Sequence, residues 1–134
     1  MVLPWLMLLP AGCDDEREPF PYVYVDVTFN ISTQLGDLPV GEYVIKEKYG
    51  YGGLIIYRAG RSSFYAFDRA CTYKPKKKCL LSEDNKFGLM ECPCCGSSFQ
   101  LSQEGMVFNG PATVPLKQYE AYYIPPNQLR VSSN

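Results

Sequence analysis

The sequence predicts an all-β domain built from short antiparallel strands. Short runs of alternating or apolar residues are separated by turn sequences rich in glycine, proline and asparagine. No stretch of the sequence has the length and spacing of a long amphipathic helix. The composition agrees, because 14% of the residues are aromatic and the chain contains 11 Gly and 11 Pro, which is typical of strands joined by turns. A length of 134 residues corresponds to one folded domain.

The first half of the domain is predicted to consist of successive hairpins. From Tyr22 to Ile31 apolar and polar residues alternate strictly, so one face of this strand should be buried. Residues 32–41 contain several turn-forming residues and predict a connection with room for one helical turn. Further strands are expected at 43–45, 54–58 and 63–68.

In the second half, each of two cysteine-containing loops follows a predicted strand. The strand at 63–68 leads to Cys71, and a strand at 87–91 leads to Cys92. A hairpin should follow around Glu104-Gly105. The remaining strands are predicted at 99–101, 106–108, 119–124 and 129–131.

The N-terminus has the pattern of a targeting segment. Residues 2–9 are apolar but too few to span a bilayer, and Pro10-Ala11-Gly12-Cys13 follows them. Small residues before a cysteine resemble a bacterial lipobox, although Pro10 replaces the usual aliphatic residue and no Lys or Arg precedes the apolar run. The resemblance implies that Cys13 carries a lipid, and that the domain is a membrane-anchored lipoprotein of the bacterial cell envelope, outside the cytoplasm. The alternative is a buried N-terminal strand, which the prolines and the acidic run at 14–18 oppose.

Charge and composition exclude several classes of function. A net charge of -1 and a pI near 5.4 give no field that would attract nucleic acid. The chain contains no histidine, which excludes a Ser-His-Asp triad, and no carboxylate or lysine is singled out as a general base. The sequence therefore predicts no catalytic site, and at most an electron-transfer module.

Five of the six cysteines lie between Cys71 and Cys95. Thiolates that converge from two loops suit tetrahedral zinc or an iron–sulfur cluster. The pair Cys92 and Cys95 has the spacing of a metal knuckle, and Cys71 with Cys79 could supply a second pair, although seven residues separate them. The predicted ligand set is therefore Cys71, Cys79, Cys92 and Cys95.

Residues 64–123 resemble the cluster-binding half of a Rieske iron–sulfur domain, whose two loops read CTH and CPCHGS. The residues that carry the resemblance, in matching order and spacing, are Cys71-Thr72-Tyr73, Cys92-Pro93-Cys94-Cys95-Gly96-Ser97, Phe99, Gly105, Gly110-Pro111-Ala112 and Pro115-Leu116. The resemblance implies a β-sandwich base and a small two-loop lobe. The expected divisions are a signal and tether at 1–20, a single domain at 21–134, a base at 21–69 plus 113–134, and a lobe at 70–112.

The departures from the family pattern fall on the metal ligands. Tyr73 and Cys95 stand at the two histidine positions, so the two-cysteine, two-histidine ligation of a Rieske cluster cannot form. The resemblance also implies a disulfide between Cys79 and Cys94. That pairing would leave Cys71, Cys92 and Cys95 with Tyr73, whose neutral phenol is a poor ligand at pH 7, unless Cys79 joins them.

Three hypotheses remain open from the sequence. The first is a cysteine-ligated metal, either a low-potential 2Fe-2S cluster or zinc, and we prefer it because Cys95 replaces one ligand type with another. The second is a metal-free binding or structural module stapled by disulfides. The third is thiol redox chemistry at Cys92-Pro93-Cys94-Cys95, which the lack of a following helix opposes. A basic tip of four lysines at 74–78 could steer an acidic redox or protein partner, or could simply be a solvated loop.

Overall fold

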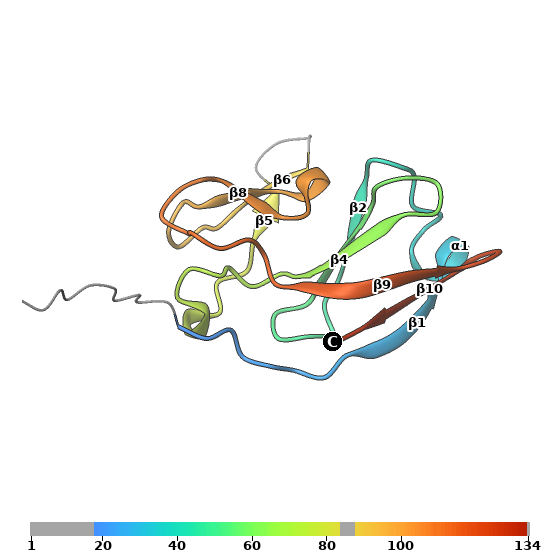
Figure 1. The fold of residues 1–134 in the computed structure, drawn as a ribbon, viewed down its shortest axis with the longest axis horizontal. Coiled ribbons are helices and arrows are strands. Elements are labelled where there is room, and N and C mark those ends of the chain that lie inside the picture. Colours follow the sequence, from blue (N-terminus) through green and yellow to red (C-terminus); the bar gives the residue numbers. More distant parts are fainter. Residues whose placement is uncertain (1–17, 84–87, 134) are drawn as a thin grey trace, which may run out of the picture.

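The structure is a computed structural model that describes residues 18–83 and 88–133 (Figure 1). The predicted lipidation site Cys13 and the rest of the signal lie outside the described residues. Two antiparallel sheets confirm the all-β class. The larger sheet has the order β1 (Asp26–Asn30), β10 (Gln128–Ser132), β9 (Gln118–Ile124), β4 (Phe64–Asp68), β3 (Leu54–Arg58), β2 (Tyr43–Lys46), and the smaller has the order β5 (Ser82–Glu83), β6 (Leu89–Glu91), β7 (Ser98–Gln100), β8 (Met106–Asn109).

Within residues 18–83 and 88–133, helical structure is limited to single turns. These are α1 (Ile31–Gln34), η1 (Pro75–Lys77) and η2 (Leu101–Gln103). In the described part of the chain, no helix has the length and apolar character needed to cross a membrane.

The first strand is shorter than its alternating sequence predicts. It begins at Asp26 and ends at Asn30, four residues after the expected start and one before the expected end. The end is set by Asn30, whose side-chain oxygen accepts the backbone N–H of Thr33 at 3.0 Å and caps helix α1. Capping therefore overrides the strand pattern at Ile31. Strand β5 was not predicted, because two exposed residues carry no alternation.

Strand β9 joins the two halves of the larger sheet. Its first residues, 118–119, pair with residues 66–67 of β4, whereas residues 120–124 pair with residues 128–132 of β10. One continuous strand thus connects β4, β3 and β2 with β10 and β1 (Figure 1).

Strand β3 is buried on both faces, which explains its continuous apolar sequence. Leu54 and Ile56 belong to the core of the larger sheet, together with Phe29 and Leu129. Ile55 and Tyr57 belong to a second core, which contains residues of both sheets. The other buried members of that second core are Phe67, Cys71, Leu81, Met90, Cys92, Phe99, Leu101, Ala112 and Leu116. The four-stranded lobe therefore packs directly on strands β3 and β4.

A buried carboxylate at the end of β4 fixes the start of the first cysteine loop. Asp68 is fully buried and accepts backbone N–H groups from Tyr51 at 2.7 Å, Gly52 at 2.9 Å and Ala70 at 3.0 Å. The Tyr119 hydroxyl donates to it at 2.7 Å, and burial together with this carboxylate raises the pKa of Tyr119. Four donors from three separate segments thus converge on one side chain, directly before Cys71.

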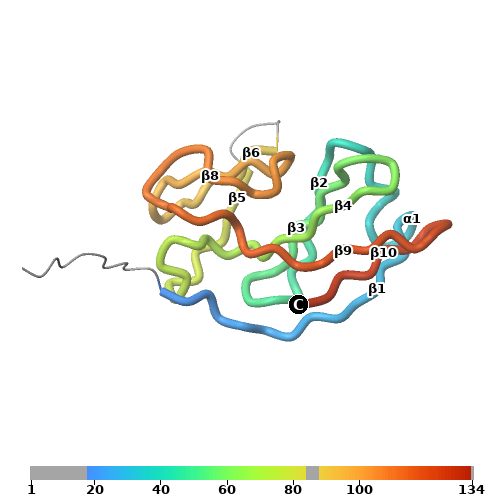
Figure 2. The backbone as a smooth tube through the Cα atoms, in the orientation of Figure 1, coloured from blue at the N-terminus to red at the C-terminus, as the bar shows by residue number. Residues whose placement is uncertain are grey.

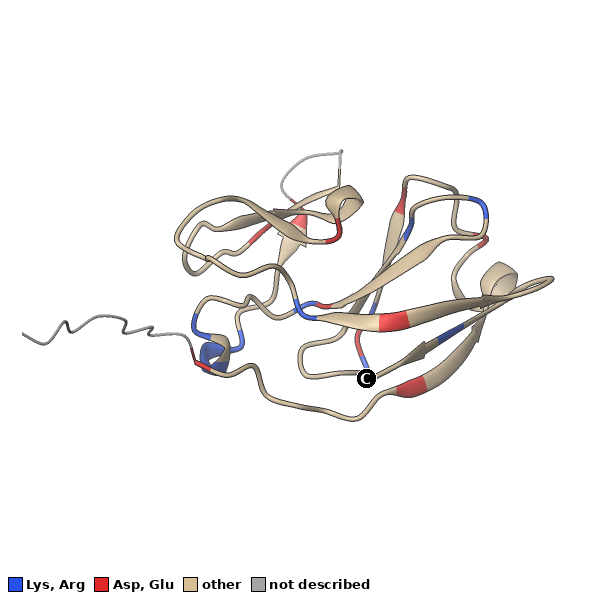
Figure 3. Cartoon of the chain, viewed as in Figure 1, with Lys and Arg blue, Asp and Glu red and all other residues tan. Residues whose placement is uncertain are grey.

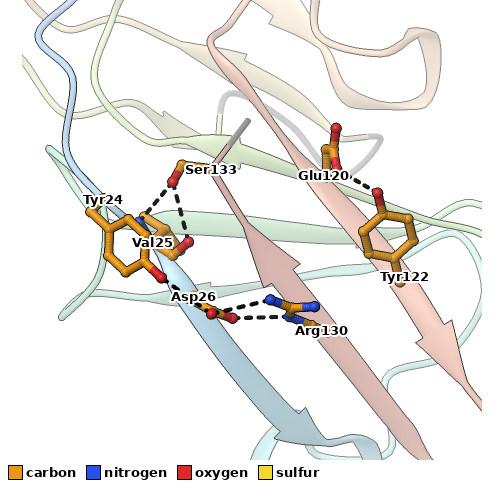
Figure 4. Close-up of polar contacts among 7 residues, drawn as sticks. All are labelled: Tyr24, Val25, Asp26, Glu120, Tyr122, Arg130 and Ser133. Carbon is orange, nitrogen blue, oxygen red and sulfur yellow. Dashed lines mark hydrogen bonds and ion pairs between the residues drawn. The ribbon is translucent and has the colours of Figure 1, made fainter.

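A second polar cluster lies on the surface where β1 pairs with β10 (Figure 4). Arg130 donates two hydrogen bonds to Asp26, at 2.9 and 3.1 Å, and the Tyr24 hydroxyl donates a third at 3.3 Å. Nearby, the Ser133 side chain accepts the Val25 N–H at 3.2 Å. These groups are exposed or half-buried, so water can replace their hydrogen bonds and the cluster contributes little to the stability of the fold.

Replacing the buried carboxylate should destabilise the domain strongly. We expect Asp68→Ala to lower the free energy of unfolding by about 3 kcal/mol, because it leaves two buried and two part-buried donors without their acceptor. Asp26→Ala, which removes an exposed carboxylate, is the matched control and should have a much smaller effect. Urea denaturation of both variants measures the difference. Similar losses in the two variants would show that Asp68 does not organise the fold.

Candidate metal centre

The first cysteine loop runs from Ala70 to Leu80 and is closed at its base. Ala70 and Leu80 form an isolated β-bridge, and the Cys71 N–H donates to the Cys79 carbonyl at 2.9 Å. The turn η1 occupies the tip, between left-handed residues at Lys74 and Lys78. Cys71 and Cys79 are therefore held side by side by the backbone.

The second loop connects β6 to β7 and is a tight turn. The Cys92 N–H donates to the Ser97 carbonyl at 2.8 Å, and the Gly96 N–H donates to the Cys92 carbonyl at 2.9 Å. Gly96 has a φ of +80°, a conformation that glycine adopts without strain. Cys94 and Cys95 lie within this turn and Cys92 lies at its base, so all three are presented toward the first loop.

A third segment, residues 109–112, supports the second loop from outside it. The Ser97 hydroxyl oxygen accepts the Ala112 N–H at 2.9 Å and lies 3.1 Å from Cys95 Sγ. Gly110 packs so closely that an added Cβ atom would lie 2.3 Å from Ser97 Cα. The residues that resemble a Gly-Pro-Ala loop therefore serve to position Ser97, and through it Cys95.

Three free thiols converge between the two cysteine loops. The sulfur atoms of Cys71, Cys92 and Cys95 all lie within 4.8 Å of one another, and Cys71 Sγ is 3.8 Å from Cys95 Sγ. Cys71 and Cys92 are buried, whereas Cys95 is partly exposed. The cluster thus lies at the edge of the lobe core, with one member accessible to solvent.

The other two cysteines of the stretch form a disulfide. Cys79 and Cys94 are joined with a Cα–Cα distance of 6.2 Å, the pairing that the resemblance implied. The structure therefore brings together three of the four predicted ligands. In this oxidation state Cys79 is not a thiolate and cannot serve as the fourth ligand.

Tyr73 does not approach the thiols as a buried ligand. Its backbone N–H donates to Cys71 Sγ at 3.4 Å, but its side chain is 37% exposed. The Lys74 ammonium lies 5.5 Å from the centre of its ring. The residue at the first histidine position therefore contributes a backbone hydrogen bond to the cluster.

The surroundings shift the pKa values of Cys71 and Cys95 in opposite directions. Burial raises the pKa of Cys71, and the neighbouring Cys92 and Cys95 thiols add to the effect. Burial alone would also raise the pKa of Cys95, but hydrogen bonds with the Ser97 hydroxyl, the Ser97 backbone and the Cys92 and Cys71 thiols outweigh it and leave the pKa below its ordinary value. Cys95 therefore becomes a thiolate more readily than Cys71, and a bound cation would displace the proton of Cys71.

The sequence analysis missed two residues that shape this centre. Asp68 fixes the entry to the first loop, and Ser97 connects Cys95 to residues 109–112. The signal for Ser97 was present, because it belongs to the motif that carries the resemblance. No sequence signal marks Asp68, since its partners are mostly backbone groups distant along the chain.

The close approach of Gly110 to Ser97 can be tested with two alanine substitutions. Gly110 and Gly41 both have positive φ, at +107° and +90°, but only Gly110 has neighbours that an added Cβ would strike. We expect Gly110→Ala to cost about 2 kcal/mol more than Gly41→Ala in the free energy of unfolding, because backbone atoms must move apart. Gly110→Ala should also accelerate alkylation of Cys95, measured by mass spectrometry. Equal effects of the two substitutions would contradict the packing described above.

Comparison with known proteins agrees with this architecture. The Rieske [2Fe-2S] domain family matches residues 29–120, whereas a search of curated proteins gives no significant match. Among solved structures, the ferredoxin of Sphingomonas yanoikuyae B1 superposes with a TM-score of 0.50 at 20% identity, covering 78% of this chain and 94% of the ferredoxin. This likeness supports the fold.

Two further structures have lower TM-scores. A chain from the complex of reduced oxygenase and oxidized ferredoxin in carbazole 1,9a-dioxygenase has a TM-score of 0.49 and 26% identity, over 74% of this chain and 87% of that chain. A chain described as the small subunit of an NADH-dependent nitrite reductase from Mycobacterium tuberculosis has a TM-score of 0.49 and 17% identity, over 84% and 97%. Because the family match covers most of the chain and the two cysteine loops, this protein belongs to the Rieske [2Fe-2S] domain family.

Proposed function

We propose that this Rieske-family domain is a metal-binding module that holds its metal through the thiols of Cys71, Cys92 and Cys95 and has no active site of its own. The convergence of these three sulfur atoms within 4.8 Å of one another carries the proposal. Thiolates select soft metals, such as zinc or the iron of iron–sulfur clusters, over calcium and magnesium. The two loops that supply them are closed by backbone hydrogen bonds, which supports a site that is formed before the metal arrives.

The cluster that is typical of the family does not fit the residues of this chain. Its second iron needs two histidines, whereas the chain has none and carries Tyr73 and Cys95 at those positions. The ligands of a single ion fit better. Sulfur atoms bound tetrahedrally to one Zn²⁺ at ~2.3 Å lie ~3.8 Å apart, and Cys71 Sγ lies 3.8 Å from Cys95 Sγ. Zinc is therefore the favoured occupant, and it would link the two loops.

A cysteine-ligated 2Fe-2S cluster is the second candidate, and membership of the family favours it. Such a cluster needs a fourth protein ligand, which the chain can provide only if Cys79 leaves its disulfide. The domain would then be an electron-transfer module with a redox partner. The lysines around η1 (Figure 3) support a partner with an acidic surface.

The metal-free alternative is favoured by the disulfide between Cys79 and Cys94, which already joins the two loops. In that case the fold would be a binding or structural module, and a metal would add nothing to the connection between the loops. The two functions differ in metal content.

Metal analysis should separate these candidates. We expect the full chain carrying Cys13→Ser, purified from an aerobic host, to contain about one metal site per chain. Cys92→Ser and Cys95→Ser should each lose most of the metal, whereas Tyr73→Phe, a change at the same site, should keep it. Elemental analysis, acid-labile sulfide and the visible spectrum distinguish zinc from an iron–sulfur cluster.

A colourless chain without metal would refute the proposal. Thiol titration would then identify the alternative. The single disulfide of the structure leaves three free thiols, Cys71, Cys92 and Cys95, before reduction. A module stapled by two disulfides would show only one.

We also propose that Cys13 anchors the domain to a bacterial envelope membrane. The first described residue, Glu18, accepts the Lys76 N–H at 3.2 Å, so the start of the described chain lies beside the first cysteine loop (Figure 2). Five residues span at most ~18 Å, so an anchor at Cys13 would keep the lysine-rich tip of this loop close to the lipid surface. Electrostatic attraction to anionic lipids would reinforce such an arrangement.

The anchor can be tested by fractionation of a bacterial host that expresses the full chain. We expect the protein in the membrane fraction, with release only by detergent, because a lipid-modified N-terminus partitions into the bilayer. Cys13→Ser should move it to the soluble fraction, while Glu16→Gln should not. Recovery of the unsubstituted chain in the soluble fraction would contradict the proposal.

A further inference from the structure

The disulfide and the three free thiols form one continuous group of sulfur atoms. Besides the first group, the sulfur atoms of Cys79, Cys92 and Cys94 also lie within 4.8 Å of one another. Cys92 belongs to both groups. The oxidised pair therefore lies next to the proposed metal site.

We propose that the Cys79–Cys94 disulfide is a redox gate on the metal site: its reduction supplies Cys79 as a fourth thiolate and converts an open three-thiol site into a closed four-thiolate site. This inference rests on the proposed function and adds its regulation. A dithiol, either a small molecule or a dithiol protein, is the required reductant.

The two halves of the disulfide differ in exposure, which gives the reduction a direction. Cys94 is exposed, whereas Cys79 is half-buried. A thiolate of the dithiol attacks Cys94 Sγ, the S–S bond breaks, and the electron pair leaves on Cys79 Sγ. The second thiol of the reductant then attacks the mixed disulfide and releases Cys94, so that the dithiol becomes a disulfide and the protein gains two thiols.

After reduction, the backbone keeps Cys79 beside the site. The Cys71 N–H donates to the Cys79 carbonyl at 2.9 Å, and the flanking residues Ala70 and Leu80 form a β-bridge. Neither interaction depends on the disulfide. Cys94 is exposed whereas Cys79 is half-buried, so Cys79 is the half that can join the other three thiols.

A fourth thiolate changes what the site can hold. Three protein ligands leave one position of a tetrahedral ion open, whereas four close it and give the arrangement of structural zinc sites. Four thiolates are also the number that an all-cysteine 2Fe-2S cluster requires. The reduced form should therefore bind a soft metal more tightly than the oxidised form.

The test compares zinc affinity in two oxidation states of the full chain carrying Cys13→Ser. We measure zinc affinity under argon by competition with a chromophoric chelator, before and after treatment with a small dithiol that is then removed. The reduced chain should bind zinc more than about tenfold more tightly, an effect at least as large as that of losing an outer-shell partner.

Two matched variants distinguish the effect of gaining a fourth ligand from the effect of losing the disulfide. Both Cys94→Ser and Cys79→Ser remove the disulfide, but only Cys94→Ser keeps the proposed fourth ligand. Cys94→Ser should bind zinc tightly without a reductant, whereas Cys79→Ser should bind weakly before and after reduction. Co²⁺ provides a second readout, because its thiolate charge-transfer absorption grows with the number of bound thiolates.

The outcomes distinguish failure of the gate from failure of the site. Equal zinc affinity in both oxidation states, or equal affinity of the two variants, overturns the gate and leaves the metal site standing. Absence of zinc and Co²⁺ binding in every form overturns the proposed function itself. If circular dichroism shows that a variant is unfolded, the gate is tested by the zinc affinities of the oxidised and reduced chain alone.

Discussion

The buried carboxylate of Asp68 is the interaction on which the position of the cysteine loops depends. A charge in an apolar interior is tolerated only when hydrogen bonds replace its water, and here the donors are the turn at 51–52, the backbone at Ala70 and the hydroxyl of Tyr119. Each donor comes from a different part of the chain. This one side chain therefore fixes the relative positions of the β2–β3 turn, strand β9 and the start of the first cysteine loop.

Strand β3 connects the lobe to the larger sheet. Because both faces of β3 are buried, the core of the larger sheet and the core of the lobe share one strand, with Leu54 and Ile56 on one side and Ile55 and Tyr57 on the other. Cys71 and Cys92 are themselves members of the second core. The thiol cluster is thus an extension of the apolar packing, which explains why the framework persists where the histidines of the family are absent.

The sequence predicted correctly those features that depend on neighbouring residues or on a family motif. The continuous apolar run predicts β3 with the bounds that the structure has, and the family motif identifies both cysteine loops. The sequence did not predict features that depend on residues far apart along the chain. Alternation from Tyr22 onward gave no sign that pairing with β10 begins only at Asp26, or that Asn30 caps a helix. Cysteine spacing alone placed Cys79 among the ligands, whereas the family resemblance implied the Cys79–Cys94 disulfide that the structure has, with Cys71, Cys92 and Cys95 as the remaining thiols.

The closure of the two loops also bears on how the energy of metal binding is used. In small zinc fingers the metal must order the chain, so much of its binding energy is spent on folding. Here the Cys71–Cys79 backbone contact, the turn at 92–97 and the Ser97 bridge to Ala112 hold the loops without an ion. The centre is preorganised, and affinity is not reduced by the entropy of loop ordering. A chelator should consequently empty such a centre and leave the domain folded.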